Sequence, residues 1–216
     1  MDNDARSGTF ITLEGPDGAG KSRQAAALAE RLRGLGRDVV LTREPGGTTL
    51  GERIRALLLE ISSDEHDPIS DALLFSAARR RHVGEVIGPA LERGAIVICD
   101  RYADSTLAYQ GHGDGLPIDS LRELTEFATG GLWPVRTVLI DVSAAEGLTR
   151  RQMGAAMDMT RFEVADAHGM AFHERVRQGY LDLAAAEPQR WRVVDGAGSP
   201  DEVAQRIWSA LADLVG

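Results

Sequence analysis

The stretch EGPDGAGKSRQ, residues 14–24, decides the fold of this chain. It contains the pattern G-x-x-x-x-G-K-[ST], formed by Gly15, Pro16, Asp17, Gly18, Ala19, Gly20, Lys21 and Ser22. The pattern lies between a predicted strand at 9–14 and a predicted helix at 21–34. In that setting, backbone N–H groups and the helix N-terminus converge on phosphate oxygens. We therefore expect residues 15–22 to form a phosphate-binding loop.

Two side chains of this loop indicate that its ligand is a nucleotide. Lys21 would reach the β- and γ-phosphates, and Ser22 would provide an oxygen ligand for Mg²⁺. A glycine-rich turn without a ligand has no need of both residues. The motif does not predict the reaction, because motors, switches, transporters and kinases share it. Gly18 stands where a basic residue could have faced the phosphates.

Strands and helices alternate along the rest of the chain. Short aliphatic and β-branched runs predict buried strands at 9–14, 38–42, 95–100, 136–141 and 191–195. Amphipathic segments between them predict helices at 21–34, 50–60, 68–93, 118–129, 166–186 and 200–214. The alternation predicts an α/β protein, a three-layer P-loop fold with a five-stranded parallel sheet covered by helices on both faces. Ligands of such sheets bind at the carboxyl ends of the strands.

Length and composition favour one globular domain over residues 1–216. The chain has 43% hydrophobic and 26% charged residues, the balance of a soluble protein. Its net charge of −9 argues against a surface that binds nucleic acid, which needs many Lys and Arg side chains. Cys99 is the only cysteine, and neither a signal peptide nor an apolar run of membrane-spanning length is visible. We therefore expect a cytoplasmic protein with no nucleic-acid or membrane partner.

Four further segments lie at the ends of predicted strands or on nearby helices. They are TREPGGT (42–48), LLFSAARRRH (73–82), DRYADSTLAYQG (100–111) and GLTRRQMGAAMDMTRFE (147–163). Each also has a purely structural interpretation, as a surface turn, a core helix, a capping loop or a surface helix. In the second segment, Phe75 and Arg79 are i, i+4 neighbours on one helix face, a pair that can stack on and hydrogen-bond a base.

In their order and spacing, the phosphate loop and these segments resemble the thymidylate kinase family. The match runs from Thr9 to about Asp195, and TREPGGT with DRYADSTLAYQG is its most specific part. The resemblance implies an enzyme that transfers the γ-phosphoryl group of ATP, with Mg²⁺ as cofactor, to thymidine monophosphate (TMP) in dTTP synthesis. It also implies a homodimer.

The resemblance further implies an acceptor site. Its residues would be Asp17, Glu44, Pro45, Arg55, Phe75, Arg79, Arg101, Ser105, Tyr109 and Gln110. Phe75 would stack on the thymine ring and Arg79 would hydrogen-bond its exocyclic oxygen. A tyrosine packed against the 2′ position would reject ribonucleotides.

Catalysis, by the same resemblance, depends on positive charge. Phosphoryl transfer needs alignment of donor and acceptor and stabilisation of charge on the equatorial oxygens. The implied catalytic residues are Lys21, Arg101, Arg151 and Asp17. Ser22 and Asp100 would hold Mg²⁺ and its water shell.

The family takes a catalytic arginine either from the phosphate loop or from a lid. Gly18 leaves this loop without one, so the resemblance implies a mobile lid, at about 148–163, that closes and excludes water. The middle of that segment is apolar where arginines are expected. Arg150, Arg151 and Arg161 remain as candidates, and we expect Arg151 to be catalytic.

Two other functions remain open from the sequence. A kinase for another pyrimidine deoxynucleoside monophosphate would have a similar pocket. A regulator that binds ATP with little turnover would fit the depleted lid. Against the regulator, Asp17, Arg79, Asp100 and Arg101 are residues that an ATP sensor does not need.

Overall fold

Five parallel strands form the centre of the molecule. The computed structural model describes residues 8–60, 67–153 and 165–215, without the side chains of 151–153 and 165–168. The strand order is β2-β3-β1-β4-β5, with β1 (Thr9–Glu14), β2 (Val39–Arg43), β3 (Ile96–Asp100), β4 (Arg136–Asp141) and β5 (Trp191–Asp195). Each lies within one residue of its predicted bounds. The predicted α/β fold with a five-stranded parallel sheet is confirmed.

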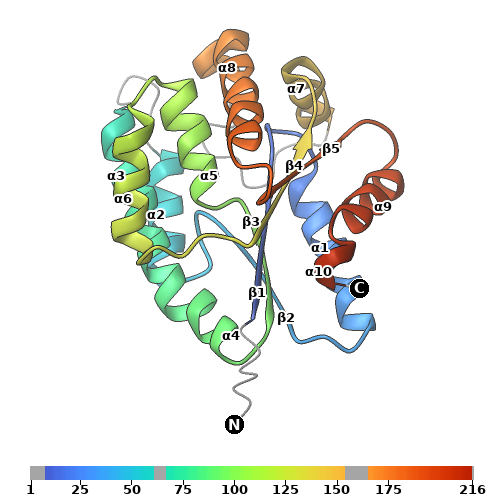
Figure 1. The fold of residues 1–216 in the computed structure, drawn as a ribbon. Coiled ribbons are helices and arrows are strands. Elements are labelled where there is room, and N and C mark those ends of the chain that lie inside the picture. The colour runs from blue at the N-terminus through green and yellow to red at the C-terminus, as the bar shows by residue number, and fades with distance from the viewer. Residues whose placement is uncertain (1–7, 61–66, 154–164, 216) are drawn as a thin grey trace.

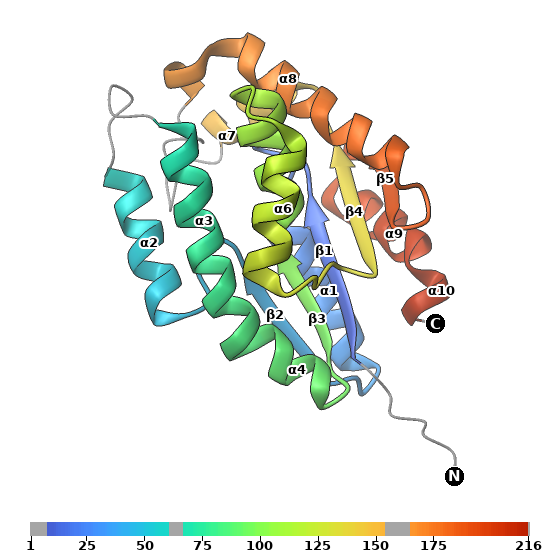
Figure 2. The ribbon, with the colours of Figure 1, turned by 60° about the vertical axis from the view of Figure 1, so that its left-hand side comes forward.

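Helices cover both faces of this sheet (Figure 1). One face carries α1 (Lys21–Gly34), α9 (Pro200–Ala210) and α10 (Ala212–Val215). The other carries α2 (Thr49–Glu60), α3 (Pro68–His82), α4 (Gly88–Glu92), α5 (Ala103–Thr106), α6 (Ile118–Thr129) and α8 (Ala165–Ala186). In Figure 2, α2, α3 and α6 stand side by side, with α2 farthest to the left and the strands of the sheet mostly to their right. α7 (Ala144–Met153) follows the carboxyl end of β4.

Two of the helical segments contain π-helical turns. α3 continues through η2 (Val83–Ile87) into α4, so the helix predicted at 68–93 is continuous but changes its pitch. α5 continues into η3 (Leu107–Gly113), a helical segment that we did not predict. Its sequence, ADSTLAYQGHG, is poor in strong helix formers, but most of its residues are buried, and packing overrides propensity there. π-Turns inside helices are frequent at functional sites.

A buried polar cluster fixes α5 and η3 on the sheet. Asp104 of α5 is completely buried, and Arg190 donates to both of its carboxylate oxygens, from Nη1 to Oδ2 (2.6 Å) and from Nη2 to Oδ1 (2.9 Å). Thr137 of β4 donates to Asp104 Oδ2 at 3.1 Å and accepts from Thr12 of β1 at 3.0 Å. Bidentate pairs of this kind add geometric specificity as well as energy. The cluster therefore holds the segment that carries several predicted site residues in one place.

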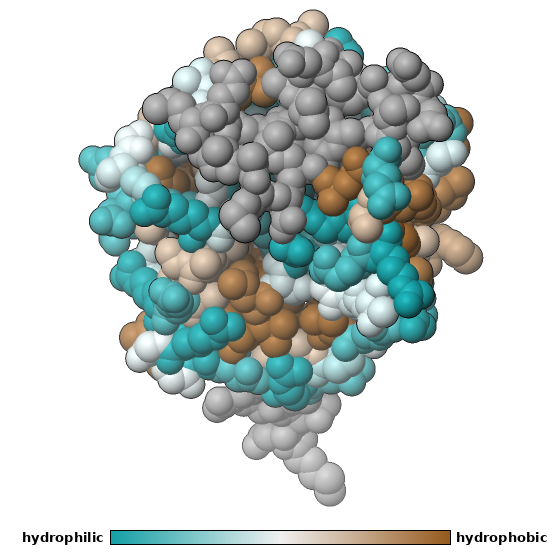
Figure 3. Space-filling model, turned by 180° about the vertical axis from the view of Figure 1, so that it is seen from behind, coloured by the Kyte–Doolittle hydropathy of each residue, from teal (hydrophilic) through white to brown (hydrophobic). Residues whose placement is uncertain are grey.

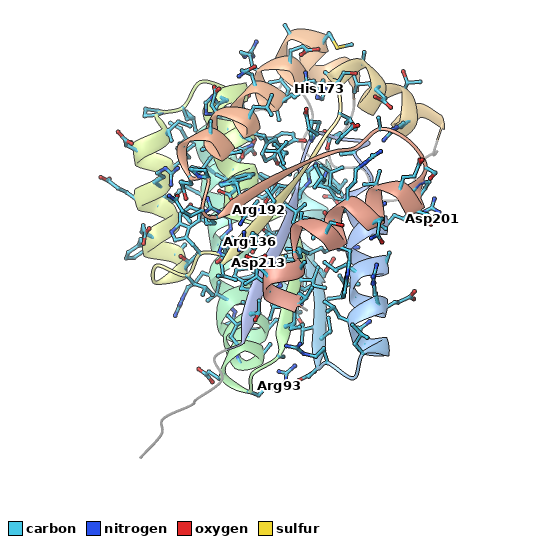
Figure 4. The ribbon with its side chains drawn as sticks, turned by 45° about the vertical axis from the view of Figure 1, so that its right-hand side comes forward. Arg93, Arg136, His173, Arg192, Asp201 and Asp213 are labelled. Atoms are coloured by element: carbon cyan, nitrogen blue, oxygen red, sulfur yellow. The ribbon has the colours of Figure 1, made fainter. Side chains whose placement is uncertain are left out.

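The amino ends of the strands lie at the end of the molecule opposite to the carboxyl ends, where the predicted site residues lie. Arg136, at the start of β4, donates to Asp213 of α10 at 2.7 Å, and Figure 4 labels this pair next to Arg192 of β5. Arg93 lies near the lower tip in the same view, where it pairs with Asp38 at 2.9 Å in solvent. These ion pairs are remote from the strand ends at which the predicted site residues lie.

The surface is mostly polar, with a few exposed apolar side chains. On the face seen in Figure 3, apolar side chains gather near the centre of the lower half, surrounded by polar ones. Phe127 of α6 is the most exposed large apolar side chain in the described part of the chain, at 88%. No helix among the described residues has the length and apolar character needed to cross a membrane.

Candidate active site

The phosphate loop leaves β1 and enters α1, as predicted. Lys21 is 7% exposed, and its Nζ donates to the carbonyl oxygens of Gly15 (3.0 Å) and Pro16 (2.9 Å), so the side chain folds back along the loop. Gly20, directly before α1, has a left-handed conformation (φ 88°) that residues with a Cβ rarely adopt. The first turn of α1 has no side-chain cap, so its N–H groups are available to a phosphate.

The loop packs directly against the backbone of α7. Gly18 has a φ of 73°, and a Cβ added there would lie 1.9 Å from the carbonyl oxygen of Gly147. Conversely, a Cβ on Gly147 would lie 2.2 Å from the carbonyl oxygen of Asp17. Close packing leaves no room for a carbon atom at such distances, so this arrangement requires glycine at both positions. Close packing against α7 is therefore a sufficient reason for a glycine at position 18, whichever segment supplies the catalytic cation.

Ser22 and Asp100 meet at the start of α1 and the end of β3. Ser22 Oγ donates to Asp100 Oδ2, whereas Asp100 Oδ1 is buried and has no partner among the described residues. Hydroxyl and carboxylate oxygens are hard ligands that suit Mg²⁺ or its bound water, so the pair fits the predicted ion. The described residues contain no group of three or more His, Cys, Asp and Glu side chains able to hold a metal. The nucleotide phosphates would have to supply the remaining ligands.

Arg101 follows β3 in a strained backbone conformation. Its φ is 68°, and no other non-glycine residue in the described part of the chain has a positive φ. Such strain is typical of functional sites. The guanidinium donates to Asp17 Oδ1 (2.5 Å), Tyr109 Oη (3.1 Å), Ser105 Oγ (3.2 Å), Tyr180 Oη (3.2 Å) and the Gly15 carbonyl (3.5 Å). These bonds hold a largely buried cation beside the phosphate loop.

A second buried cluster lies where β2 ends. Arg79 of α3 is 1% exposed, and its Nε donates to Glu44 Oε2 at 2.8 Å. Its Nη2 donates to the Tyr102 carbonyl (3.3 Å) and to Thr106 Oγ1 (3.0 Å). Burial opposes the charge of Arg79, but the Glu44 carboxylate outweighs this effect, and the pKa of Arg79 is raised. His82 Nδ1 contacts the other oxygen, Oε1, at 3.0 Å, so two residues of α3 contact the two carboxylate oxygens of Glu44.

The two clusters line one pocket at the carboxyl ends of β1, β2 and β3. Every residue predicted for the acceptor site lines it, namely Asp17, Glu44, Pro45, Arg55, Phe75, Arg79, Arg101, Ser105, Tyr109 and Gln110. Tyr102 and Thr106, which we did not predict, complete the lining. Residues separated by more than ninety positions in the sequence are thus brought together, as expected for strand ends of a parallel sheet.

Three pocket residues have buried polar atoms that no described residue satisfies. These atoms are Asp17 Oδ2, Arg79 Nη1 and Gln110 Nε2. A buried polar atom without a partner costs about 1–3 kcal/mol, and native structures rarely leave one so. The set contains one acceptor and two N–H donors, with the flat apolar wall of Phe75 in the same pocket. It suits a planar ligand that carries carbonyl oxygens and a hydroxyl group.

Glu14, the last residue of β1, belongs to the site although we did not predict it. It is completely buried and accepts hydrogen bonds from the Tyr102 backbone N–H (2.7 Å), Ser105 Oγ (2.6 Å) and Tyr180 Oη (2.8 Å). Burial, and to a smaller degree the carboxylate of Asp104, raises the pKa of Glu14 to about 7. A glutamate at the carboxyl end of a buried strand was the only local indication of this role.

Most of the predicted lid, at about 148–163, lies outside the described residues. In the described part, Arg150 of α7 donates to the Gly196 carbonyl at 2.9 Å and to Glu146 Oε1 at 2.6 Å. Arg150 is therefore engaged at the connection between β5 and α9. The side chain of Arg151 and the whole of Arg161 lie outside the described part of the chain.

The fold and the site together define a class of protein. A G-x-x-x-x-G-K-[ST] loop at the centre of a parallel sheet, next to a pocket lined by arginines and an aromatic side chain, is the arrangement of a P-loop kinase that acts on a small phosphorylated substrate. The comparison with known proteins then identifies the family.

A family model described as thymidylate kinase matches residues 13–207. Thymidylate kinases of Thermomicrobium roseum and Deinococcus radiodurans are 53% and 52% identical to this chain over 206 residues, covering 95% of it and 95% and 97% of the relatives. A crystal structure of thymidylate kinase from Ehrlichia chaffeensis superposes with a TM-score of 0.76 and 36% identity, over 95% of this chain and 99% of that one. The chain therefore belongs to the thymidylate kinase family and is a kinase.

Proposed function

We propose that this chain phosphorylates TMP to the diphosphate with ATP as the phosphoryl donor, a step in dTTP synthesis. One observation carries the proposal: a single pocket joins the expected acceptor-site residues to the phosphate loop through Asp17 and Arg101. Family membership supports the same reaction.

The base is recognised by stacking and by two donors. Phe75 provides a partly buried flat surface for thymine. Arg79 Nη1 and Gln110 Nε2, which lack partners among the described residues, donate to the carbonyl oxygens of the ring. Tyr109 packs against the sugar at its 2′ position and excludes ribonucleotides, while Asp17 Oδ2 accepts from the 3′-hydroxyl.

Phosphoryl transfer is driven by cations on this chain. The phosphate loop and Lys21 hold the donor phosphates, and Arg101 and Arg55 hold the acceptor phosphate. A phosphate monoester dianion is already a nucleophile, so no general base is needed. Asp17 pairs with Arg101 at 2.5 Å and so fixes the guanidinium that aligns the acceptor.

Mg²⁺ accompanies ATP as the cofactor. Ser22 and Asp100 are the residues that would hold it, the first through its hydroxyl and the second through the water shell. When bound, the ion neutralises charge on the donor phosphates. The hydrogen bond between Ser22 and Asp100 keeps these two oxygens together before the nucleotide arrives.

The remaining assignments concern the closed state and the location of the enzyme. Because Arg150 is engaged by the Gly196 carbonyl, we assign the catalytic cation of the lid to Arg151. We assign water exclusion to the lid at about 148–163, within a single domain 1–216. A reducing cytoplasm suits the single, buried cysteine, Cys99.

A coupled assay for ADP formation, run with a panel of nucleoside monophosphates, tests the proposed function. We expect the highest kcat/KM with TMP. A higher kcat/KM with another pyrimidine deoxynucleotide would change the assigned acceptor but leave the assignment as a kinase intact. ATP binding without turnover of any acceptor would favour a nucleotide-dependent regulator.

Replacement of Phe75 by alanine should raise the KM for TMP by about tenfold, because base–aromatic stacking contributes about 1–3 kcal/mol. The KM for ATP should stay within about twofold, because Phe75 lines the acceptor pocket from α3 and does not belong to the phosphate loop. Steady-state kinetics with each substrate varied in turn checks both values, so ATP serves as the internal control. Equal rises in the two KM values would show that Phe75 acts as a core residue.

We further propose a homodimer formed through the outer faces of α3 and α6. Phe127 of α6 is 88% exposed and Leu73 of α3 is 53% exposed, and both border a hollow between the two helices. Leu124 and Ala128 contribute to the same hollow. Ser76 and Arg80 also line the hollow, so two exposed apolar side chains border a partly polar depression, a combination that suits a protein interface.

The substitution Phe127→Glu should convert this dimer to a monomer, because it places a charge at the centre of an apolar contact. Sedimentation velocity measures the change directly. The matched control is Leu35→Glu, an equally drastic change at a 60% exposed residue on the opposite side of the sheet, which should leave the dimer intact. A dimer that survives Phe127→Glu would place the interface elsewhere.

A further inference from the structure

Arg101 is connected to Glu14 through two hydroxyl groups. Arg101 Nη1 donates to Ser105 Oγ and to Tyr180 Oη, each at 3.2 Å. Both hydroxyls contact Glu14 Oε2, at 2.6 Å and 2.8 Å. A guanidinium can only donate, so each hydroxyl accepts from Arg101 and keeps its single hydrogen for another partner. The carboxylate of Glu14 is an acceptor within reach of both hydrogens, and the two hydroxyl oxygens also lie 2.9 Å from each other.

The charge of Glu14 decides the direction of these hydrogen bonds. An ionised carboxylate accepts from both hydroxyls and from the Tyr102 backbone N–H at 2.7 Å. A carboxyl protonated on Oε2 must itself donate to one hydroxyl, whose own hydrogen then turns to the other hydroxyl, 2.9 Å away, so these donors compete with Arg101 for the same two oxygens. Three convergent donors therefore suit the ionised form, and this form gives Arg101 two correctly oriented acceptors.

We propose that Glu14 is the positioning residue for Arg101, because its carboxylate orients the Ser105 and Tyr180 hydroxyls that hold the guanidinium. Glu14 is completely buried and does not line the acceptor pocket, so it acts through Arg101 rather than on the substrate. The inference rests on the proposed function, in which Arg101 binds the acceptor phosphate.

Glu14 is the member of this cluster that changes its charge near neutral pH. The groups that act on it or feel its charge are Asp104 of α5, Arg101 and Tyr102 after β3, Cys99 of β3, Arg79 of α3 and Tyr180 of α8. Burial raises the pKa values of Cys99 and Tyr180 well above their usual range, so both stay protonated. Burial and Asp104 raise the pKa of Glu14 to about 7, against the opposing charge of Arg101.

Ionisation of Glu14 should have opposite effects on activity, which should rise with pH, and on stability, which should fall. Ionised Glu14 orders Arg101, so kcat/KM for TMP should rise as the pH passes from 6 to 8, through the folded-state pKa of about 7. The folded-state pKa lies above the ordinary value of 4.5, so the free energy of unfolding should fall between these two values and level off above them. The more active ionisation state is thus the less stable one.

The variant Glu14→Gln tests the proposal, because glutamine keeps the volume but cannot ionise. Its kcat/KM for TMP should be about tenfold below wild type at pH 8, the scale of losing a hydrogen bond to a charged group, and close to wild type at pH 6. Calorimetry of TMP binding at pH 7, in buffers of different ionisation enthalpy, should show more proton release by the wild type than by the variant, in which only the TMP phosphate can contribute. Glu92→Gln, at an exposed carboxylate of α4, is the matched control and should match the wild type.

The variant Tyr180→Phe provides a second, milder test if Glu14→Gln folds poorly. It removes one donor to the carboxylate, which should raise the pKa of Glu14 and move the rise in kcat/KM to higher pH. Ionisation of the TMP phosphate contributes equally to the pH profile of kcat/KM in every variant. A difference between two profiles therefore reports the ionisation of Glu14.

Identical pH profiles and identical proton release in wild type and Glu14→Gln would overturn the proposal. An unshifted profile in Tyr180→Phe would do the same. Both outcomes leave the proposed function intact, since the wild type would still phosphorylate TMP. A wild type without TMP turnover would instead reject the proposed function and this role together.

Discussion

Replacing Arg101 with lysine is expected to lower kcat by about 10³-fold while the protein stays folded. The guanidinium donates simultaneously to Asp17, Tyr109 and Tyr180. A lysine ammonium keeps the charge, but one nitrogen on a flexible stem cannot span acceptors arranged around a planar fork. The expected loss therefore measures the geometry of the cation, since its charge is unchanged.

The measurement is kcat at saturating ATP and TMP, together with the midpoint of thermal unfolding. Arg93→Lys is the matched control: Arg93 is in an exposed ion pair near the other end of the molecule and should give wild-type rates (Figure 4). A loss below about tenfold for Arg101→Lys would show that positive charge alone suffices at this position.

Replacing Arg79 with methionine should lower the free energy of unfolding by about 3–5 kcal/mol, the usual cost of breaking a buried ion pair. The side chains of Arg79 and Glu44 are 2% and 5% exposed, so the change leaves the Glu44 carboxylate buried without its cation. The same variant loses the Nη1 donor, and the KM for TMP should rise with little change in the KM for ATP.

Urea unfolding monitors the stability of this variant. The double change Arg79→Met with Glu44→Gln removes the unpaired charge and should recover much of the stability without recovering TMP affinity. The control, Arg43→Met, breaks an ion pair with Glu52 that is about half exposed on both sides and should cost less than about 1 kcal/mol. Equal losses in Arg79→Met and Arg43→Met would contradict the assigned burial energetics.

The sheet was predictable because each strand carries its own local pattern. The runs that end at Glu14, Asp100 and Asp141 are short and mostly apolar, and each ends in an acidic residue. Because parallel strands have their carboxyl ends at one edge of the sheet, the sequence also predicts which segments lie close together. Phe75, Arg79 and Gln110 accordingly line one pocket.

Contacts between distant residues were not predictable. Glu14 and Tyr180 are separated by 166 positions, and nothing near either residue indicates that their side chains touch. The close approach of Gly18 and Gly147 is equally non-local, because it depends on where α7 lies above the loop. The dual role of Arg79, as part of the pocket and as the partner of buried Glu44, also appears only once the fold brings α3 onto β2. The roles of Arg151 and the lid stay predictions.

The contact between the phosphate loop and α7 restricts which residues this chain can accept at position 18. Relatives of the other kind place an arginine at the position of Gly18, but Gly18→Arg here would force a Cβ into the Gly147 carbonyl. The helix would have to shift first, and that shift would displace Arg150 and Arg151 before the new cation was in place. The position of α7 above the loop therefore excludes an arginine at position 18 unless the helix moves.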